Sequence, residues 1–191
     1  MKTSPVGLAD LQGVFAQPRL VLDDTGEIDW RASQKEVESL ARQGVTRFVY
    51  CGDGFSGLAL ESFGKLTTWL QGFPKDFWVI PGVGPDWNLA EQQAEVLAKR
   101  YFPCVLFLAG ADLAELGQWE VRIRSLHTRA KKPLALALRS PAELGPDPDA
   151  SLQVVLRLMR EGVFLFVCCK DTTVAAWAAR VLDSRRVVVA S

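Results

Sequence analysis

Short apolar runs alternate with amphipathic stretches along most of the chain. The runs are rich in β-forming residues, and their starts lie roughly 20 to 35 residues apart, the repeat expected of βα units. The predicted strands cover residues 13–17, 47–51, 77–82, 103–108, 133–138, 163–169 and 186–190. Continuous apolar runs are typical of parallel strands buried on both faces, so the pattern predicts an α/β protein. The spacing alone fits both an open doubly wound sheet and most of a (β/α)8 barrel.

Helical patterns fill the intervals between the predicted strands. In residues 29–44, Asp29 is placed to cap the first turn and Gly44 to end the helix. Similar patterns cover residues 88–101, 114–130, 149–162 and 172–184. No low-complexity stretch or linker divides the chain, so we expect residues 1–191 to form one domain.

Composition restricts the partners. The 22 Lys and Arg residues balance the 22 Asp and Glu residues, so no net charge favours binding to nucleic acid or to an anionic membrane. The sequence has no apolar export segment and no run of about 18 apolar residues, which favours a cytoplasmic protein. We expect Cys51, Cys104, Cys168 and Cys169 to be reduced thiols without a metal, because they lie in apolar runs without CxxC spacing.

A lysine follows directly on the sixth apolar run, VFLFVCC at residues 163–169. Strand alternation predicts that Lys170 lies on the side of Phe164, Phe166 and Cys168. If that side faces a barrel interior, desolvation favours the neutral amine, which attacks carbonyls and forms Schiff bases. Alternatively, Lys170 reaches solvent and pairs with a neighbouring carboxylate, Asp171 or Asp53. This stretch leaves both interpretations open.

Other polar residues near predicted strand ends carry weaker signals. Gly82 and Gly84 lack the third glycine of a dinucleotide fingerprint and predict a tight turn. Asp53 lies between two glycines, where capping a helix is its commonest role. His127 is the only histidine and lies in a polar helical stretch, which favours an exposed helix residue over a catalytic one.

Three segments together resemble the dihydrodipicolinate synthase and N-acetylneuraminate lyase family. GVFAQPRLVLDDTGEIDW at residues 13–30 is similar to the family's opening, and IPGVGPDWNLAEQQAEVLAKR at 80–100 to its third strand and following helix. VCCKDTT at 167–173 is similar to its sixth strand, which ends in Lys-Asp-Ser-Ser or a close variant. The resemblance implies a (β/α)8 TIM-barrel type fold, of which this chain holds about seven βα units.

The resemblance also implies a reaction. Lys170 would form an imine with pyruvate or a related 2-oxo acid, and the enamine would add to an aldehyde or be released by retro-aldol cleavage. Such a class I aldolase-like carbon–carbon lyase needs no cofactor. The expected partners are a small 2-oxo acid or aldehyde, and a homo-oligomer is left open.

The chain departs from the family's pattern at two substrate positions. Where the family has Gly-Thr-Thr-Gly-Glu, this chain has Gly52, Asp53 and Gly54, and the carboxylate of Asp53 would repel that of a keto acid. Ala137 stands where the fifth strand should carry the proton-relaying tyrosine. We expect these residues to border the substrate.

These departures leave two functional hypotheses. In an active enzyme, water, Asp53, Ser140 or a cysteine would have to transfer the proton. The alternative is a catalytically inactive barrel used for ligand binding or assembly. The family also continues into an eighth strand, so a sheet that ends at residue 190 is expected to leave two unpaired edges.

Overall fold

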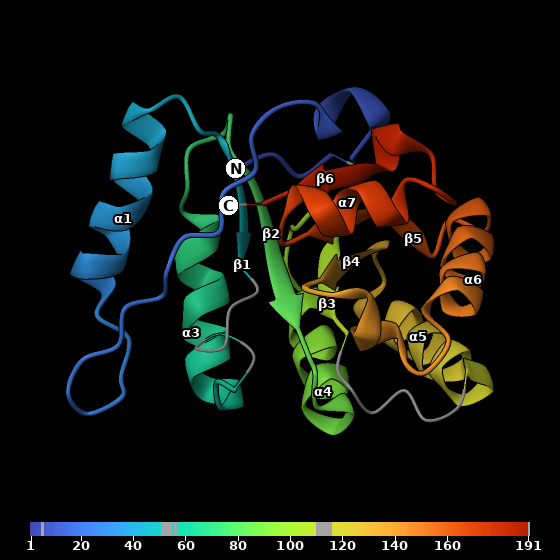
Figure 1. Ribbon diagram of the computed structural model, residues 1–191. Helices are drawn as coiled ribbons and strands as arrows, with labels where there is room; N and C mark the ends of the chain where they lie inside the picture. Colours follow the sequence, from blue (N-terminus) through green and yellow to red (C-terminus); the bar gives the residue numbers. More distant parts are fainter. Residues whose placement is uncertain (5, 51–54, 56, 110–115, 191) are drawn as a thin grey trace.

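The computed structural model describes residues 1–4, 6–50, 55, 57–109 and 116–190. Its centre is a curved sheet of six parallel strands, a partial barrel in which each strand pairs with the next along the chain (Figure 1). This consecutive order excludes the doubly wound alternative, in which the order reverses. The strands are β1 (Arg47–Tyr50), β2 (Trp78–Val83), β3 (Val105–Leu108), β4 (Leu134–Leu138), β5 (Phe164–Cys169) and β6 (Val187–Val189).

Helices connect the strands and cover the outer face of the sheet (Figure 1). Among the α-helices of the described residues, four follow an aspartate whose side chain accepts a backbone N–H of the first turn, which is a favoured cap. Asp29 and Gly44 flank the first helix as predicted. The α-helices are α1 (Trp30–Arg42), α3 (Leu60–Gln71), α4 (Trp87–Ala98), α5 (Leu116–Ala130), α6 (Pro148–Arg160) and α7 (Thr172–Ala178). The 3-10 helices are η1 (Leu8–Leu11), η2 (Pro141–Leu144) and η3 (Ser184–Arg186).

The first predicted strand, residues 13–17, forms only isolated bridges. Phe15 bridges Ala190, just beyond β6, and Ala16 bridges Phe48 of β1, both in parallel. Backbone hydrogen bonds of 2.9 Å join Ala16 to β1 on both sides of this bridge. The prediction of about seven βα units is therefore not confirmed. We expected the sheet to leave both of its edges unpaired. This was wrong at Phe48 and Ala190, because residues 13–17 bridge both edges of the sheet.

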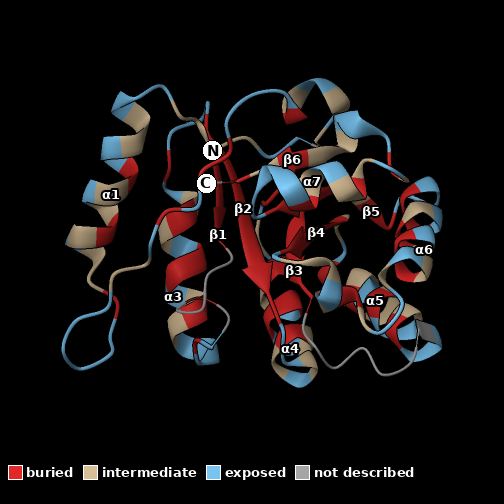
Figure 2. Cartoon of the chain, viewed as in Figure 1, coloured by how far each residue is buried: buried red, intermediate tan, exposed pale blue. Residues whose placement is uncertain are grey.

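Buried side chains form two clusters, one on each face of the sheet. The outer cluster packs strand residues against the helices and against the aromatic side chains that follow α3. Figure 2 shows the strands as the most continuously buried part of the chain. The inner cluster lies on the concave face and consists of Leu11, Phe15, Val49, Ile80, Cys104, Leu106, Leu108, Ala135, Ala137, Phe166, Cys168, Val188 and Ala190.

A bulge in β5 changes which side chains face inward. Leu134 pairs with Phe164, but Leu136 pairs with Val167, so β5 has one residue more than β4 over this interval. Phe164 consequently lies in the outer cluster, whereas Phe166 and Cys168 lie in the inner one. The prediction that Phe164 shares a side with Phe166 was wrong, because simple alternation assumes an unbroken ladder.

The helix η1 closes the inner cluster at the amino ends of the strands. Leu11 belongs to the cluster, and Leu8 packs against it. At the start of β1, the Nε of Arg47 donates a 3.0 Å hydrogen bond to the carbonyl oxygen of Asp10 in η1. The cluster is therefore covered at this end, and the opposite end is where a ligand has room.

Candidate functional site

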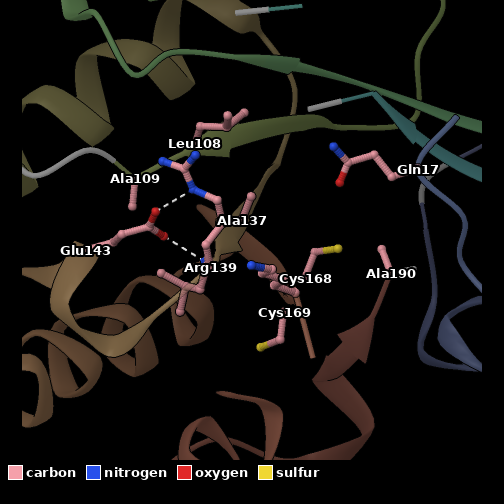
Figure 3. Close-up of a pocket in the computed structure, with 11 residues that line it drawn as sticks. Gln17, Leu108, Ala109, Ala137, Arg139, Glu143, Cys168, Cys169 and Ala190 are labelled. Carbon is pink, nitrogen blue, oxygen red and sulfur yellow. Dashed lines mark hydrogen bonds and ion pairs between the residues drawn. The ribbon is translucent and has the colours of Figure 1, made fainter. Parts of the chain in front are cut away.

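A cavity of about 240 Å³ opens at the carboxyl ends of β3, β4 and β5. In α/β folds with parallel strands this edge is where ligands and substrates bind. The volume is just below the roughly 300–1,000 Å³ of most small-molecule pockets, which suits a small ligand. Figure 3 shows the lining side chains: Gln17, Leu108, Ala109, Ala137, Leu138, Arg139, Glu143, Cys168, Cys169, Lys170 and Ala190.

The cavity exists because small side chains occupy the last inward-facing positions of the strands. Ala137, Cys168 and Ala190 belong both to the inner cluster and to the cavity wall. One inward step before Cys168, Phe166 fills the interior, and its ring centroid lies 6.0 Å from that of Phe15. The space at the carboxyl ends is therefore set by side-chain volume rather than by a gap between strands.

Lys170 lines the cavity as the first residue beyond β5. Its backbone N–H donates to the carbonyl oxygen of Leu138 at 2.9 Å, which fixes the end of β5 against β4. Its side chain is exposed, which corrects the expectation of a lysine held among apolar groups. β5 ends at Cys169, as predicted, so Lys170 follows the strand and its side chain lies at the cavity mouth.

Asp171 is engaged with the following helix rather than with Lys170. Its carboxylate accepts hydrogen bonds from the backbone N–H groups of Thr173 at 2.9 Å and Val174 at 3.0 Å, which caps α7. Within the described part of the chain, no ion pair joins the Lys170 ammonium to a carboxylate. The predicted pairing with Asp171 is therefore absent.

The remaining predicted site residues divide into two groups. Ala137 lies in β4, is 8% exposed and contributes to the cavity wall. Gly52, Asp53 and Gly54 lie outside the described residues, so their expected position beside the substrate stays a prediction. Cys51 is outside them as well.

An ion pair that the sequence interpretation missed lies in the cavity wall. Arg139 follows β4, and its backbone N–H donates to Glu143 Oε2 at 2.7 Å while its Nε donates to Oε1 at 2.6 Å (Figure 3). The Glu143 side chain is only 13% exposed. The sequence did hold an indication of this ion pair, because Arg139 and Glu143 are four residues apart directly after an apolar strand.

The described wall of the cavity carries a net positive charge. Its cations, Arg139 and Lys170, outnumber its single carboxylate, that of Glu143. Because Arg139 pairs with Glu143, the excess charge is that of Lys170. Opposite charges attract most strongly where solvent is partly excluded.

The three described cysteines are in no disulfide. Cys104, Cys168 and Cys169 are all buried. Burial, with a smaller contribution from the negative charge of Asp171, raises the pKa of Cys169 to about 12, so this thiol stays protonated near neutral pH. Burial also raises the pKa of Cys104. In the described ranges, no group of three or more His, Cys, Asp or Glu side chains is arranged to hold a metal ion.

Two weaker sequence signals lie elsewhere. Gly84 ends β2 with φ of 95°, and a Cβ there would approach the carbonyl oxygen of Leu108 to 3.0 Å. This confirms a tight turn where only glycine fits.

His127 is half-buried in α5 and does not line the cavity. Its burial and, to a smaller extent, the charge of Arg124 lower its pKa. No helix of the described chain is long and apolar enough to cross a membrane.

Several solved structures share this fold and carry the names of dihydrodipicolinate synthases and N-acetylneuraminate lyases. The crystal structure of dihydrodipicolinate synthase from Bacillus clausii matches with 16% identity and a TM-score of 0.71, over 95% of this chain. A prophage protein of the dihydrodipicolinic acid synthase family from E. coli K12, in complex with pyruvate, matches with 12% identity and a TM-score of 0.72, over 93% of this chain and 69% of its own. N-acetylneuraminate lyase from Fusobacterium nucleatum matches with 10% identity and a TM-score of 0.64, over 97% of this chain and 71% of its own.

The likeness concerns the fold, and it is partial in length. This chain spans 62% of the Bacillus clausii protein. No family model and no curated protein sequence matches it. The resemblance predicted from three sequence segments is thus confirmed by structures of the dihydrodipicolinate synthase and N-acetylneuraminate lyase family, at low sequence identity.

Proposed function

We propose that this protein is an aldolase-type carbon–carbon lyase that binds pyruvate or a related small 2-oxo acid as an imine on Lys170. The observation that carries the proposal is the position of Lys170, at the mouth of a cavity formed by the carboxyl ends of parallel strands. An amine there can reach the carbonyl of a bound ligand. The likeness in fold to structures that include a pyruvate complex supports the same chemistry.

The charge of the cavity supports a 2-oxo acid over a neutral carbonyl compound. Arg139 supplies a guanidinium, which binds planar carboxylates well. The small side chains of Ala137 and Ala190 leave room for a short ligand. The ligand carboxylate would then lie near Arg139 and its carbonyl carbon near Lys170.

A second candidate function is ligand binding without catalysis. It is favoured by Ala137, which offers no proton-transferring group. The family that this chain resembles has a tyrosine at that position. The side chain of Lys170 is exposed and not enclosed in the cavity, which also favours this candidate. Under this candidate the same anion would bind reversibly, with no covalent bond to the protein.

Borohydride reduction in the presence of pyruvate tests the proposal. Reduction converts an imine into a stable amine, so the protein gains the mass of the reduced ligand. We expect an adduct on the unchanged protein and its loss in Lys170→Ala. Lys35→Ala is the matched control, because Lys35 is an exposed lysine of α1 outside the cavity wall.

The outcomes separate the two candidates. An adduct that survives Lys170→Ala would contradict the assignment of the reacting amine. Saturable pyruvate binding by calorimetry, combined with no adduct across a panel of 2-oxo acids, would favour the non-catalytic candidate. Circular dichroism of each variant establishes that it is folded before the result is interpreted.

A further inference from the structure

We propose that Glu143 is the catalytic base that removes a proton from C3 of the 2-oxo acid once the acid is bound to Lys170. This inference rests on the proposed function and extends it to the proton-transfer step. It concerns a residue that the sequence interpretation did not single out. The step needs a base because imine formation alone does not produce the nucleophilic enamine of an aldolase.

The geometry of Glu143 is that of a positioned carboxylate. Each of its oxygens accepts one hydrogen bond from Arg139, at 2.6 Å from Nε and at 2.7 Å from the backbone N–H. Arg139 follows β4 directly, and Glu143 lies in η2, so the pair ties this loop to the end of the strand (Figure 3). A carboxylate has about four lone-pair sites, so two hydrogen bonds leave sites to accept a proton.

The other titratable groups in the described cavity wall are poor bases. Arg139 stays protonated in proteins. The thiol of Cys169 stays protonated near neutral pH because burial raises its pKa to about 12. Cys168 is buried, with 4% of its surface exposed. Glu143 is the carboxylate that lines the same cavity as Lys170.

The chemical step balances with one proton taken from solvent. The Nζ of neutral Lys170 attacks C2 of the acid, a proton from solvent is taken up, and the carbonyl oxygen leaves as water to give an iminium. An oxygen of Glu143 then takes a proton from C3. The electrons of the C3–H bond form the C2=C3 double bond, and the π pair of the C=N bond returns to Nζ, which becomes neutral. Glu143, now protonated, can return a proton from solvent to C3.

Arg139 is a positioning residue in this account. Its two donors hold both oxygens of Glu143, and 13% exposure of the Glu143 side chain limits competing water. Loss of Arg139 would free the carboxylate to move but would leave the base in place. Loss of the Glu143 carboxylate removes the base itself.

The test measures two steps separately on the full chain. Exchange of the pyruvate methyl protons in D2O, followed by proton NMR and corrected for the protein-free rate, reports proton removal at C3. Borohydride reduction reports imine formation on Lys170. We expect Glu143→Gln to lower the exchange rate by roughly 10²–10⁴-fold while the reduced adduct on Lys170 still forms.

Two further variants keep the result interpretable. Arg139→Ala breaks the same ion pair and also removes the cation near the ligand carboxylate, so its exchange rate is compared per reduced adduct formed. On that basis it should retain exchange at least about tenfold above Glu143→Gln, because the Glu143 carboxylate remains. Glu61→Gln removes an exposed carboxylate that pairs with Lys65 at 2.8 Å outside the cavity, and should exchange at the rate of the unchanged protein. If Glu143→Gln does not fold, Glu143→Asp serves instead, with a smaller loss expected from the shorter reach.

The possible results are distinct. Absence of both adduct and exchange in the unchanged protein overturns the proposed function. A normal adduct together with normal exchange in Glu143→Gln overturns only the role of Glu143. Equal losses of exchange in Glu143→Gln and Arg139→Ala would assign the effect to the ion pair as a structural element, and also contradict the proposal.

Discussion

Two layers of the inner cluster lie one inward step apart on the same strands and behave differently. On β3, β4 and β5 the packed layer consists of Leu106, Ala135 and Phe166, and the mouth layer of Leu108, Ala137 and Cys168. Both lie on the concave face, but only the mouth layer lines the cavity. The same strands therefore carry both the positions that fill the interior and the positions that line the cavity. Side-chain volume at the last inward position decides whether the interior is filled or open.

The largest effect is expected in the packed layer. Phe166 is fully buried and contacts Phe15, so Phe166→Ala should lower the free energy of unfolding by about 3–5 kcal/mol. Cys168→Ala, two residues along the same strand, should cost about 1 kcal/mol, because it removes one atom beside an existing cavity. Urea denaturation measures both, and similar costs would contradict the distinction between the layers.

The opposite change, from small to large, should also separate the layers. Ala135→Leu adds volume where the interior is already filled and should cost about 1–3 kcal/mol of stability. Ala137→Leu adds the same volume to the cavity wall, so it should be better tolerated but should abolish the pyruvate adduct. Thermal unfolding and borohydride reduction test this pair. An Ala137→Leu variant that still forms the adduct would show that the ligand lies elsewhere.

The predictable part of the fold is the part set by repeated local signals. Six of the seven predicted strands form, because continuous apolar runs mark strands buried between two clusters. The helix between 29 and 44 also follows from its flanking aspartate and glycine. Closure between residues 13–17 and both sheet edges was not predictable, since bridges between Phe15 and Ala190 are non-local contacts.

The site was predicted less completely than the fold. Lys170 and Ala137 line the cavity, as strand-end positions do, but Lys170 lies beyond the last residue of β5, so its side chain is exposed rather than held among apolar groups. Glu143 was missed because its approach to the cavity depends on η2 folding back towards β4. The register of a bulge and the path of a loop are decided by tertiary packing rather than by local pattern.

A smaller effect should show how α7 supports the mouth layer. Asp171→Ala removes two hydrogen bonds that cap α7 and should cost about 1 kcal/mol. Asp147→Ala removes the corresponding cap of α6 at a similar cost. Because Asp171 adjoins Lys170, only Asp171→Ala should also reduce the adduct yield. Equal yields in the two variants would mean that the α7 cap does not position the lysine.

The central claim is that the mouth layer brings a 2-oxo acid to Lys170. Peptide mass mapping of the unchanged protein, after reduction with borohydride in the presence of pyruvate, tests this claim most directly. The account predicts that the reduced ligand is confined to the peptide containing Lys170. An adduct spread over exposed lysines such as Lys35 and Lys99, with no enrichment at Lys170, would contradict it.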